Sequence, residues 1–398
     1  PKERSLLDYF ADLEDPRIDR TKDHPLINVV FIAICAVIGG AEGWTDMETF
    51  GQSKHRWLAQ FLDLSGGTPS DDTFRRVISR LDRRAFEHRF RRWTAAVVRR
   101  IGETEEGEAS LSRVALDGKT LRGSVDRDKD RIRRDGKKKA PLQLVSAWAE
   151  EQRLTLAQET VGKGTNEISA LPDVLEALEL SGALVTVDAM GTQKEIAKQI
   201  EDQGGEYVLA LKSNHPRLYG DVKSFFEDAV DRTLSDMDVE ERSETDGGHG
   251  RVEVRRCWTT DDIEWLDGKD QWPGLSSLVM VEARRSESTW DEDAEKRIWT
   301  ESVGRRYYIS SLPSDAKQVA EAVRSHWGIE NKVHWVLDVS FAEDDSRIRK
   351  GNGPCNMGLL RRIAMNALRQ TPAEESIKGR RKKAGWDEGY LEKVLGFR

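Results

Sequence analysis

Hydrophobic residues recur at three- and four-residue spacings through segments 26–37, 57–62 and 74–98. This spacing is typical of helices with one buried face. Thr68-Pro69-Ser70-Asp71 stands before the third segment and predicts a turn that leads into a helix N-cap. A polar stretch at 102–110 then interrupts the pattern. We therefore expect an N-terminal helical domain over residues 1–105.

The pattern changes after residue 110. Short apolar segments predict strands at 114–116, 142–149, 154–161, 183–187 and 207–211, and helical spacing predicts helices at 171–180 and 193–203. The first strand ends at Asp117, and a Lys- and Arg-rich loop follows over 119–139. Three strands followed by helix, strand, helix and strand indicate a mixed α/β sheet flanked by helices.

The alternation of strand and helix patterns stops over residues 215–300. There, segments of alternating apolar and polar residues at 251–258 and 278–284 predict added antiparallel strands. We interpret this region as a β-rich insertion in a domain that spans 111–372. A long helix is expected at about 314–339 and a last helix at 356–368. Residues 373–398 are interpreted as a basic tail because they contain Arg380, Arg381, Lys382 and Lys383.

Two aspartates follow predicted strands of the sheet. Asp117 comes after 114–116 and Asp188 after 183–187, and ligands usually bind at strand ends in α/β sheets. Two neighbouring carboxylates repel each other unless a cation lies between them, and Mg²⁺ prefers oxygen ligands. The alternative is that each aspartate simply forms a turn after its strand.

Glu330 is a third candidate. On the long helix, a stripe at three- and four-residue spacing predicts a buried face, and a carboxylate there needs a partner; the stripe contains Val323, Trp327, Glu330, His334 and Leu337. The partner is either a histidine one turn away, His326 or His334, or a metal ion. With the two aspartates, Glu330 could hold two metal ions about 4 Å apart for an in-line phosphoryl displacement.

Charge and composition give a weaker indication of the partner. The net charge of −8 argues against nucleic-acid binding, although ten arginines lie between residues 75 and 100. Such an array could grip phosphates or be a solvated helix face. The longest apolar run, 26–38, is too short to span a bilayer. Three widely separated cysteines form neither a zinc motif nor a disulfide framework, which favours a reducing cytoplasm.

Several motifs along the chain together indicate a family. The most specific block runs from HWGIEN at 326–331 through HWVLDV at 334–339 to Phe341. The other motifs are VALDGKT at 114–120, VDA at 187–189, LLDYF at 6–10, DPR at 15–17, HPL at 24–26, GTPS at 67–70 with Phe74, KGTNE at 163–167, YVLALKSN at 207–214 and HGR at 249–251. Over nearly the whole chain, these motifs resemble the H-repeat-associated branch of bacterial insertion-sequence transposases.

The resemblance implies an RNase H-like catalytic domain, with Asp117, Asp188 and Glu330 as its DDE triad. It further implies Mg²⁺ or Mn²⁺, two ions at the site, and cleavage and strand transfer of double-stranded DNA. The expected DNA partners are terminal inverted repeats and a target, bound by a homodimer in the bacterial cytoplasm without a membrane. Many related transposases have Tyr, Arg and Lys where this chain has Val323, His326 and Leu337.

Several further residues are candidates for supporting roles. Phosphate contacts are expected from basic and polar side chains, with a solvated loop or turn as the alternative for each; they are Lys119, Arg122, Lys212, Asn214, Arg251, Arg75 and Arg76. His326, Asn331 and His334 could orient Glu330 as outer-shell groups orient metal ligands. Trp93, Trp327 and Trp335 are expected in the core. Three alternatives to a transposase stay open: a non-catalytic DNA-binding descendant, a metal-dependent nuclease that does not join ends, and a metal-free acid/base hydrolase.

Overall fold

The computed structural model describes residues 5–18, 22–102, 112–125, 140–162, 165–231, 239–248, 250–291 and 296–397. The predicted linker at 102–110 except Gly102, most of the basic loop at 119–139, Lys163, Gly164 and His249 lie outside these ranges. Within them the chain divides into two compact units. Unit 1 contains residues up to 109, 118–178 and 329–398, and unit 2 contains 110–117 and 179–328.

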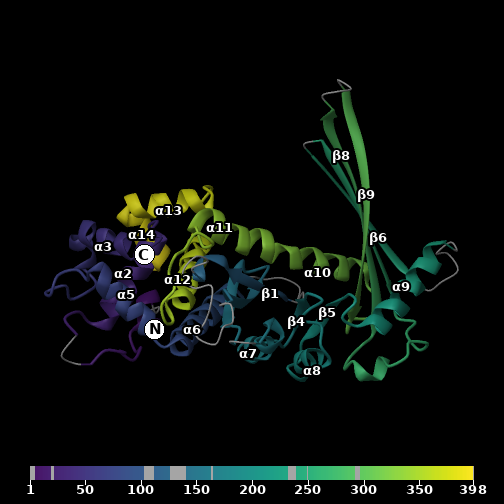
Figure 1. Cartoon of the computed structure of the whole chain (residues 1–398), viewed down its shortest axis with the longest axis horizontal. Helices are drawn as coiled ribbons and strands as arrows, with labels where there is room; N and C mark the ends of the chain where they lie inside the picture. The colour runs from purple at the N-terminus through teal and green to yellow at the C-terminus, as the bar shows by residue number, and fades with distance from the viewer. Residues whose placement is uncertain are drawn as a thin grey trace. The chain divides into compact units, whose positions relative to one another are not determined.

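Unit 1 brings helices from both ends of the chain together. The N-terminal helices are α1 (Leu6–Phe10), α2 (Leu26–Ile38), α3 (Trp44–Ser53), α4 (His55–Leu58), α5 (Asp71–Arg80) and α6 (Arg83–Gly102). The C-terminal ones are α12 (Gly353–Gln370), α13 (Ile377–Trp386) and α14 (Glu388–Leu395). Figure 1 shows α2, α12, α13 and α14 in one cluster. All but one residue of α2 is buried, so the apolar run at 26–38 is a core helix, as predicted.

Local signals explain where these helices begin. The Ser70 side chain accepts a hydrogen bond from the Thr73 amide at the start of α5, which confirms the predicted N-cap. The helix expected over 57–62 ends earlier, because α4 stops at Leu58.

The interpretation of residues 373–398 as a basic tail was wrong, since they form α13 and α14. Arg381 is buried and donates hydrogen bonds to the carbonyl oxygens of Val37 and Ala41 at 3.0 and 3.2 Å. The last carbonyls of a helix lack partners within the helix. Arg381 supplies hydrogen bonds to carbonyl oxygens at this end of α2, so its guanidinium stabilises the fold.

Unit 1 also contains a hairpin and a divided helix. Strands β2 (Leu142–Ala149) and β3 (Leu154–Thr160) pair antiparallel. The short helices around them are η2 (Arg122–Ser124), η3 (Glu167–Ser169) and α7 (Leu171–Glu176). Farther along the chain, the π-helical segment η6 (Ile329–His334) continues into α11 (Trp335–Phe341).

Unit 2 contains the parallel strands and the insertion. Strand β1 (Ser112–Leu121), of which residues to Asp117 belong here, pairs parallel with β4 (Ala183–Val187), and β4 pairs parallel with β5 (Glu206–Leu211). Four antiparallel strands follow, namely β6 (Glu240–Gly248), β7 (Arg251–Thr260), β8 (Ser277–Asp291) and β9 (Lys296–Ser310). Helices α8 (Lys194–Asp202), α9 (Pro216–Asp231) and α10 (Ala316–Gly328) and the short η5 (Lys269–Gln271) complete the unit.

The nine strands are hydrogen-bonded in the order β3-β2-β1-β4-β5-β9-β8-β7-β6. A hairpin beside parallel strands, with flanking helices, is the RNase H-like mixed α/β fold expected from the sequence. The predicted insertion is β-rich, and β8 and β9 form a long ribbon in Figure 1. It begins with helix α9, however, which the sequence pattern did not predict. Within the described residues, no helix is long and apolar enough to cross a membrane.

Two expectations near the candidate acids were wrong. Asp117 does not end its strand, because β1 continues to Leu121. The helix expected over 314–339 is interrupted by the π-helical η6, whose i to i+5 hydrogen bonds change the direction in which later side chains point. The predicted stripe is only partly buried: Val323, His334 and Leu337 are buried, but Trp327 is 44% exposed and Glu330 is also exposed. Trp335, which was expected in the core, is 60% exposed. Trp93 is buried, as expected.

Candidate active site

Asp117 and Asp188 are neighbours on the sheet of unit 2. The last paired residues of the parallel strands β1 and β4 are Leu116 and Val187, so each aspartate is the next residue along its strand. Paired residues of parallel strands have side chains on the same face, so the two aspartates share the opposite face. Adjacent strands lie about 4.8 Å apart. Both side chains are half-buried, and Asp188 Oδ1 accepts a hydrogen bond from the Gly191 amide at 2.9 Å.

The loop after β5 borders the same edge of the sheet. Asn214 is exposed, but its side-chain amide donates to the carbonyl oxygen of Ala189 at 2.6 Å. Thr192 Oγ1 donates to the Ala210 carbonyl at 2.7 Å. Asn214 therefore holds the residue after Asp188 in place. Lys212, which directly follows β5, is exposed.

His326 anchors helix α10 to this region of unit 2. Its Nδ1 lies 3.0 Å from Thr186 Oγ1, two residues before Asp188 on β4. Burial lowers the pKa of the His326 imidazole, and the nearby Asp188 carboxylate opposes this effect. The ring is thus mainly neutral near pH 7. It holds the last turn of α10, from which the chain continues one helical turn to Glu330.

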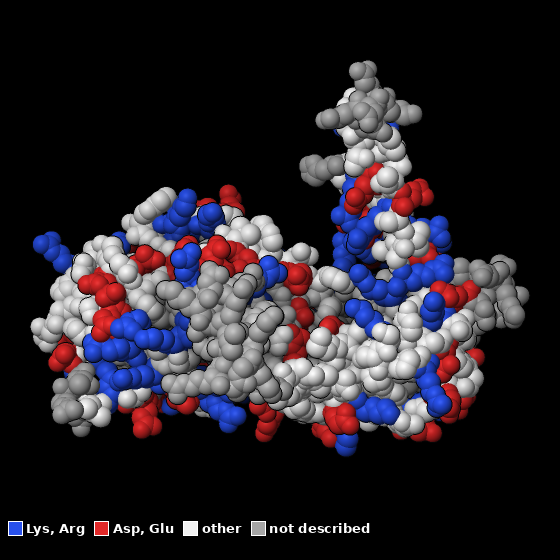
Figure 2. Space-filling view, viewed as in Figure 1, with Lys and Arg blue, Asp and Glu red and all other residues white. Residues whose placement is uncertain are grey.

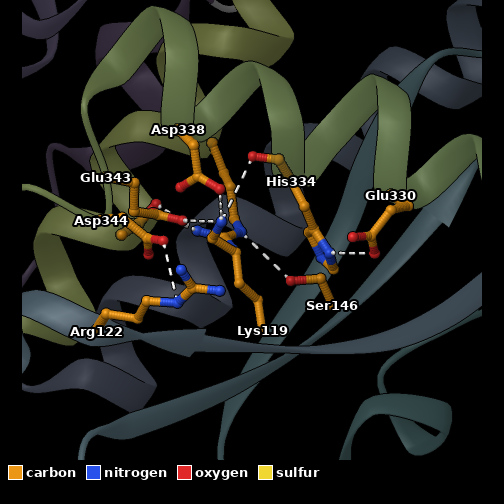
Figure 3. Close-up of polar contacts among 10 residues, drawn as sticks. Lys119, Arg122, Ser146, Glu330, His334, Asp338, Glu343 and Asp344 are labelled. Carbon is orange, nitrogen blue, oxygen red and sulfur yellow. Dashed lines mark hydrogen bonds and ion pairs between the residues drawn. The ribbon is translucent and has the colours of Figure 1, made fainter. Parts of the chain in front are cut away.

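Glu330 and His334 form a pair on η6 in unit 1. His334 Nδ1 lies 3.5 Å from Glu330 Oε2, and the histidine side chain is 7% exposed while the glutamate side chain is 61% exposed. Figure 3 shows Glu330 beside His334. The carboxylate therefore lies at the surface, where a ligand can reach it. Asn331, the third residue expected to orient Glu330, is exposed.

Lys119 was expected in the basic loop as a phosphate contact, but it lies on strand β1 and is buried in unit 1. Its Nζ donates to Asp338 Oδ2 at 2.6 Å and lies 4.0 Å from Glu343 Oε2. Beneath it, Glu343 Oε1 accepts from Arg362 Nη1 at 3.1 Å, and neither side chain is exposed. Burial raises the pKa of the Asp338 carboxyl, and the Lys119 ammonium opposes this. Figure 3 shows Lys119 beside the carboxylates of Asp338 and Glu343.

The remaining basic candidates lie at the surface, mostly in ion pairs. Arg122 is 70% exposed and pairs with Asp344 at 3.4 Å. Arg75 and Arg76 both pair with Asp72, and Arg251 pairs with Glu253 and Glu287 at 2.6 and 3.5 Å. Four arginines of α6 also have carboxylate partners, namely Arg83, Arg89, Arg91 and Arg92. Figure 2 shows basic and acidic side chains interspersed on the face in view.

Sequence reasoning missed Thr186 and the carboxylates that hold Lys119. A signal for Asp338 was present, because Glu330, His334 and Asp338 follow each other at intervals of four residues, which places them along one side of a helix. Glu343 gave no such signal, since it lies after the end of α11.

Comparisons with known proteins give the family context of this geometry. The family model described as "Transposase DDE domain" matches residues 108–367, and the model "DDE_Tnp_1-associated" matches residues 7–94. "Putative transposase YncI" of Escherichia coli O157:H7 is 37% identical over 98% of this chain and 94% of its own length. "H repeat-associated putative transposase YhhI" of Escherichia coli K12 is 33% identical over 98% of both chains. A solved piggyBac transposase synaptic complex with hairpin DNA aligns over 99% of this chain and 80% of its own, at 14% identity and a TM-score of 0.42.

Proposed function

Because the chain belongs to the DDE transposase family, in its H-repeat-associated branch, we propose that it cleaves the ends of an insertion sequence and joins them to target DNA. The observation that supports the proposal most is the parallel pairing of β1 and β4, whose last paired residues directly precede Asp117 and Asp188. We assign these two aspartates and Glu330 as the triad. All three lie inside the matched DDE domain.

The donor chemistry fits a hard divalent cation. Two carboxylates on adjacent strands repel each other, and a cation between them removes that cost. Carboxylate oxygens, which all three proposed triad residues offer, suit Mg²⁺ or Mn²⁺. When bound, two such ions activate the attacking oxygen and stabilise the leaving oxygen of a phosphodiester.

The protein's own groups position this constellation. Asp188 is oriented by the Gly191 amide, and His326 holds the last turn of α10 against Thr186. His334 lies beside Glu330 and supports its orientation, as outer-shell groups do for ligating carboxylates. Lys212 and Arg122 are exposed and are proposed as phosphate contacts, which position DNA without reading its sequence.

The test uses labelled duplexes that carry the DNA flanking the reading frame. We expect strand cleavage and strand transfer with Mg²⁺ or Mn²⁺ and neither with chelator. Asp117→Asn, Asp188→Asn and Glu330→Gln should each lose cleavage while keeping their circular dichroism spectrum and DNA affinity. Asp202→Asn is the matched control, because this carboxylate is exposed and pairs with Lys198 on α8. A triad variant that cleaves at the wild-type rate would refute the role of that residue.

The same assay separates the alternatives. Cleavage without transfer of the labelled end would identify a nuclease, and cleavage in chelator would identify metal-free acid/base chemistry. Metal binding is measured on the protein alone by Mn²⁺ electron paramagnetic resonance. If the wild-type protein binds DNA but neither binds Mn²⁺ nor cleaves the duplex, it is a non-catalytic descendant. Since transposition acts on paired ends, we also propose a dimer on DNA, which mass photometry of the complex would detect.

A further inference from the structure

Lys119 has a position that a phosphate contact does not explain. It lies on β1 two residues after Asp117, so both side chains project from the same face of that strand. Only 7% of its side chain is exposed. A buried ammonium is costly unless it is paired and hydrogen-bonded. The groups that pair with this ammonium therefore indicate its role.

The partners of Lys119 lie on the helical segment that carries Glu330. Its Nζ donates to the Asp338 carboxylate at 2.6 Å and to the carbonyl oxygen of His334 at 3.5 Å. The shorter contact is a charge-assisted hydrogen bond, which is stronger than one between neutral groups. The longer one reaches the last residue of the π-helical η6. Lys119 thus connects strand β1 to the last residue of η6 and to Asp338 in the middle of α11.

This junction determines where Glu330 points. Glu330 is the second residue of η6, and its carboxylate lies beside the ring of His334, the last residue of that segment. A π-helical turn is uncommon and is found often at functional sites. We expect it to need support from the residues packed around it. Lys119 supplies such support from the sheet, and Glu343 of the buried Glu343–Arg362 pair lies 4.0 Å from its ammonium.

We propose that Lys119 is a positioning residue that fixes the π-helical turn carrying Glu330, and that it does not contact DNA. Its tether to Asp338 and the His334 carbonyl is a property of the fold. Its effect on the reaction rests on the proposed function, because it acts through Glu330.

The experiment compares Lys119→Met, Lys119→Arg and the double variant Lys119→Met/Asp338→Leu with Lys198→Met. Lys198 is the matched control because it pairs with an aspartate at the surface, with 63% of its side chain exposed. The double variant controls for misfolding caused by an unpaired buried charge. It leaves no unpaired charge at the site, and replacing a buried ion pair with apolar groups is often neutral for stability.

The first readout is hydrogen–deuterium exchange over residues 329–341, measured without DNA or metal. We expect faster exchange there in Lys119→Met and in the double variant, and no change in Lys198→Met. Unchanged exchange in both Lys119→Met and the double variant would overturn the tether. This readout does not depend on catalysis, so it decides the tether even if the wild-type protein proves inactive and the proposed function fails.

The second readout separates positioning from DNA binding and from folding. We expect the cleavage rate at saturating DNA to fall about 10- to 100-fold in Lys119→Met, as for outer-shell partners of metal ligands. DNA affinity should stay at the wild-type level, and Lys119→Arg should recover part of the rate. The double variant should regain stability but not cleavage. Weaker DNA binding with a normal saturated rate, or full cleavage by the double variant, would overturn the proposal while leaving the proposed function intact.

Discussion

Replacing Glu343 with glutamine should be one of the most damaging single changes in unit 1. The Glu343 and Arg362 side chains are both fully buried, with Oε1 and Nη1 3.1 Å apart. At an effective dielectric constant of about 20, their attraction amounts to about 5 kcal/mol. Removing one partner leaves the other charge buried without compensation, and such changes cost about 3–5 kcal/mol. Arg362 keeps two weaker hydrogen bonds, to the Gly358 carbonyl and Ser146 Oγ at 3.0 and 3.3 Å, so we expect a loss of about 3 kcal/mol.

Urea unfolding followed by circular dichroism and tryptophan fluorescence measures this loss. A chain with two compact units need not unfold in a single step, so the shift should be confined to the transition of unit 1. Arg324→Gln is the control, because Arg324 pairs with Glu244 and Asp246 while 53% of its side chain is exposed; we expect less than about 1 kcal/mol there. A loss below about 1 kcal/mol in Glu343→Gln would show that the pair is not the buried, desolvated contact described above.

Three other substitutions test separate parts of the fold. Burial raises the pKa of the Glu87 carboxyl to about 7 despite its contact with Arg91, so the folded state holds a proton that the unfolded state has released between pH 4.5 and 7. Stability should therefore fall as pH rises through this range, by about 3 kcal/mol in total, and Glu87→Gln should remove that slope in urea titrations at each pH; an unchanged slope would refute the assignment. Gly123→Ala should destabilise unit 1 by about 1–3 kcal/mol, because its Cβ would overlap the Ser346 carbonyl oxygen. Gly220→Ala in α9 has open space around its Cβ and should instead gain about 0.5–1 kcal/mol in thermal melts; the opposite order of the two glycine variants would contradict this reasoning.

The strands of the sheet were predictable because their signals are local. Residues 183–187 form β4 as expected, and 142–149 form β2, since short apolar runs bounded by polar turns identify buried strands. Asp188 after β4 was therefore placed correctly. The expectation that Asp117 ends its strand was wrong, because β1 continues past it to Leu121.

The environment of Glu330 could not be predicted from periodicity. The stripe at three- and four-residue spacing contains His334 and Leu337, which are buried, but also Trp327 and Glu330, which are exposed. Glu330 lies in the π-helical η6, which the sequence pattern did not predict. The role of Lys119 depends on its contacts with Asp338 and the His334 carbonyl, which form only in the folded chain. Contacts between residues more than 200 positions apart leave no signal in a local pattern.

The most direct test of the triad is an anomalous diffraction map from crystals of this protein grown with Mn²⁺ and cleaved-end DNA. The account predicts manganese peaks about 2.0–2.2 Å from carboxylate oxygens of Asp117, Asp188 and Glu330. Disappearance of those peaks in Asp117→Asn crystals would agree with it. Manganese bound elsewhere, with these three carboxylates ligating no ion, would contradict it.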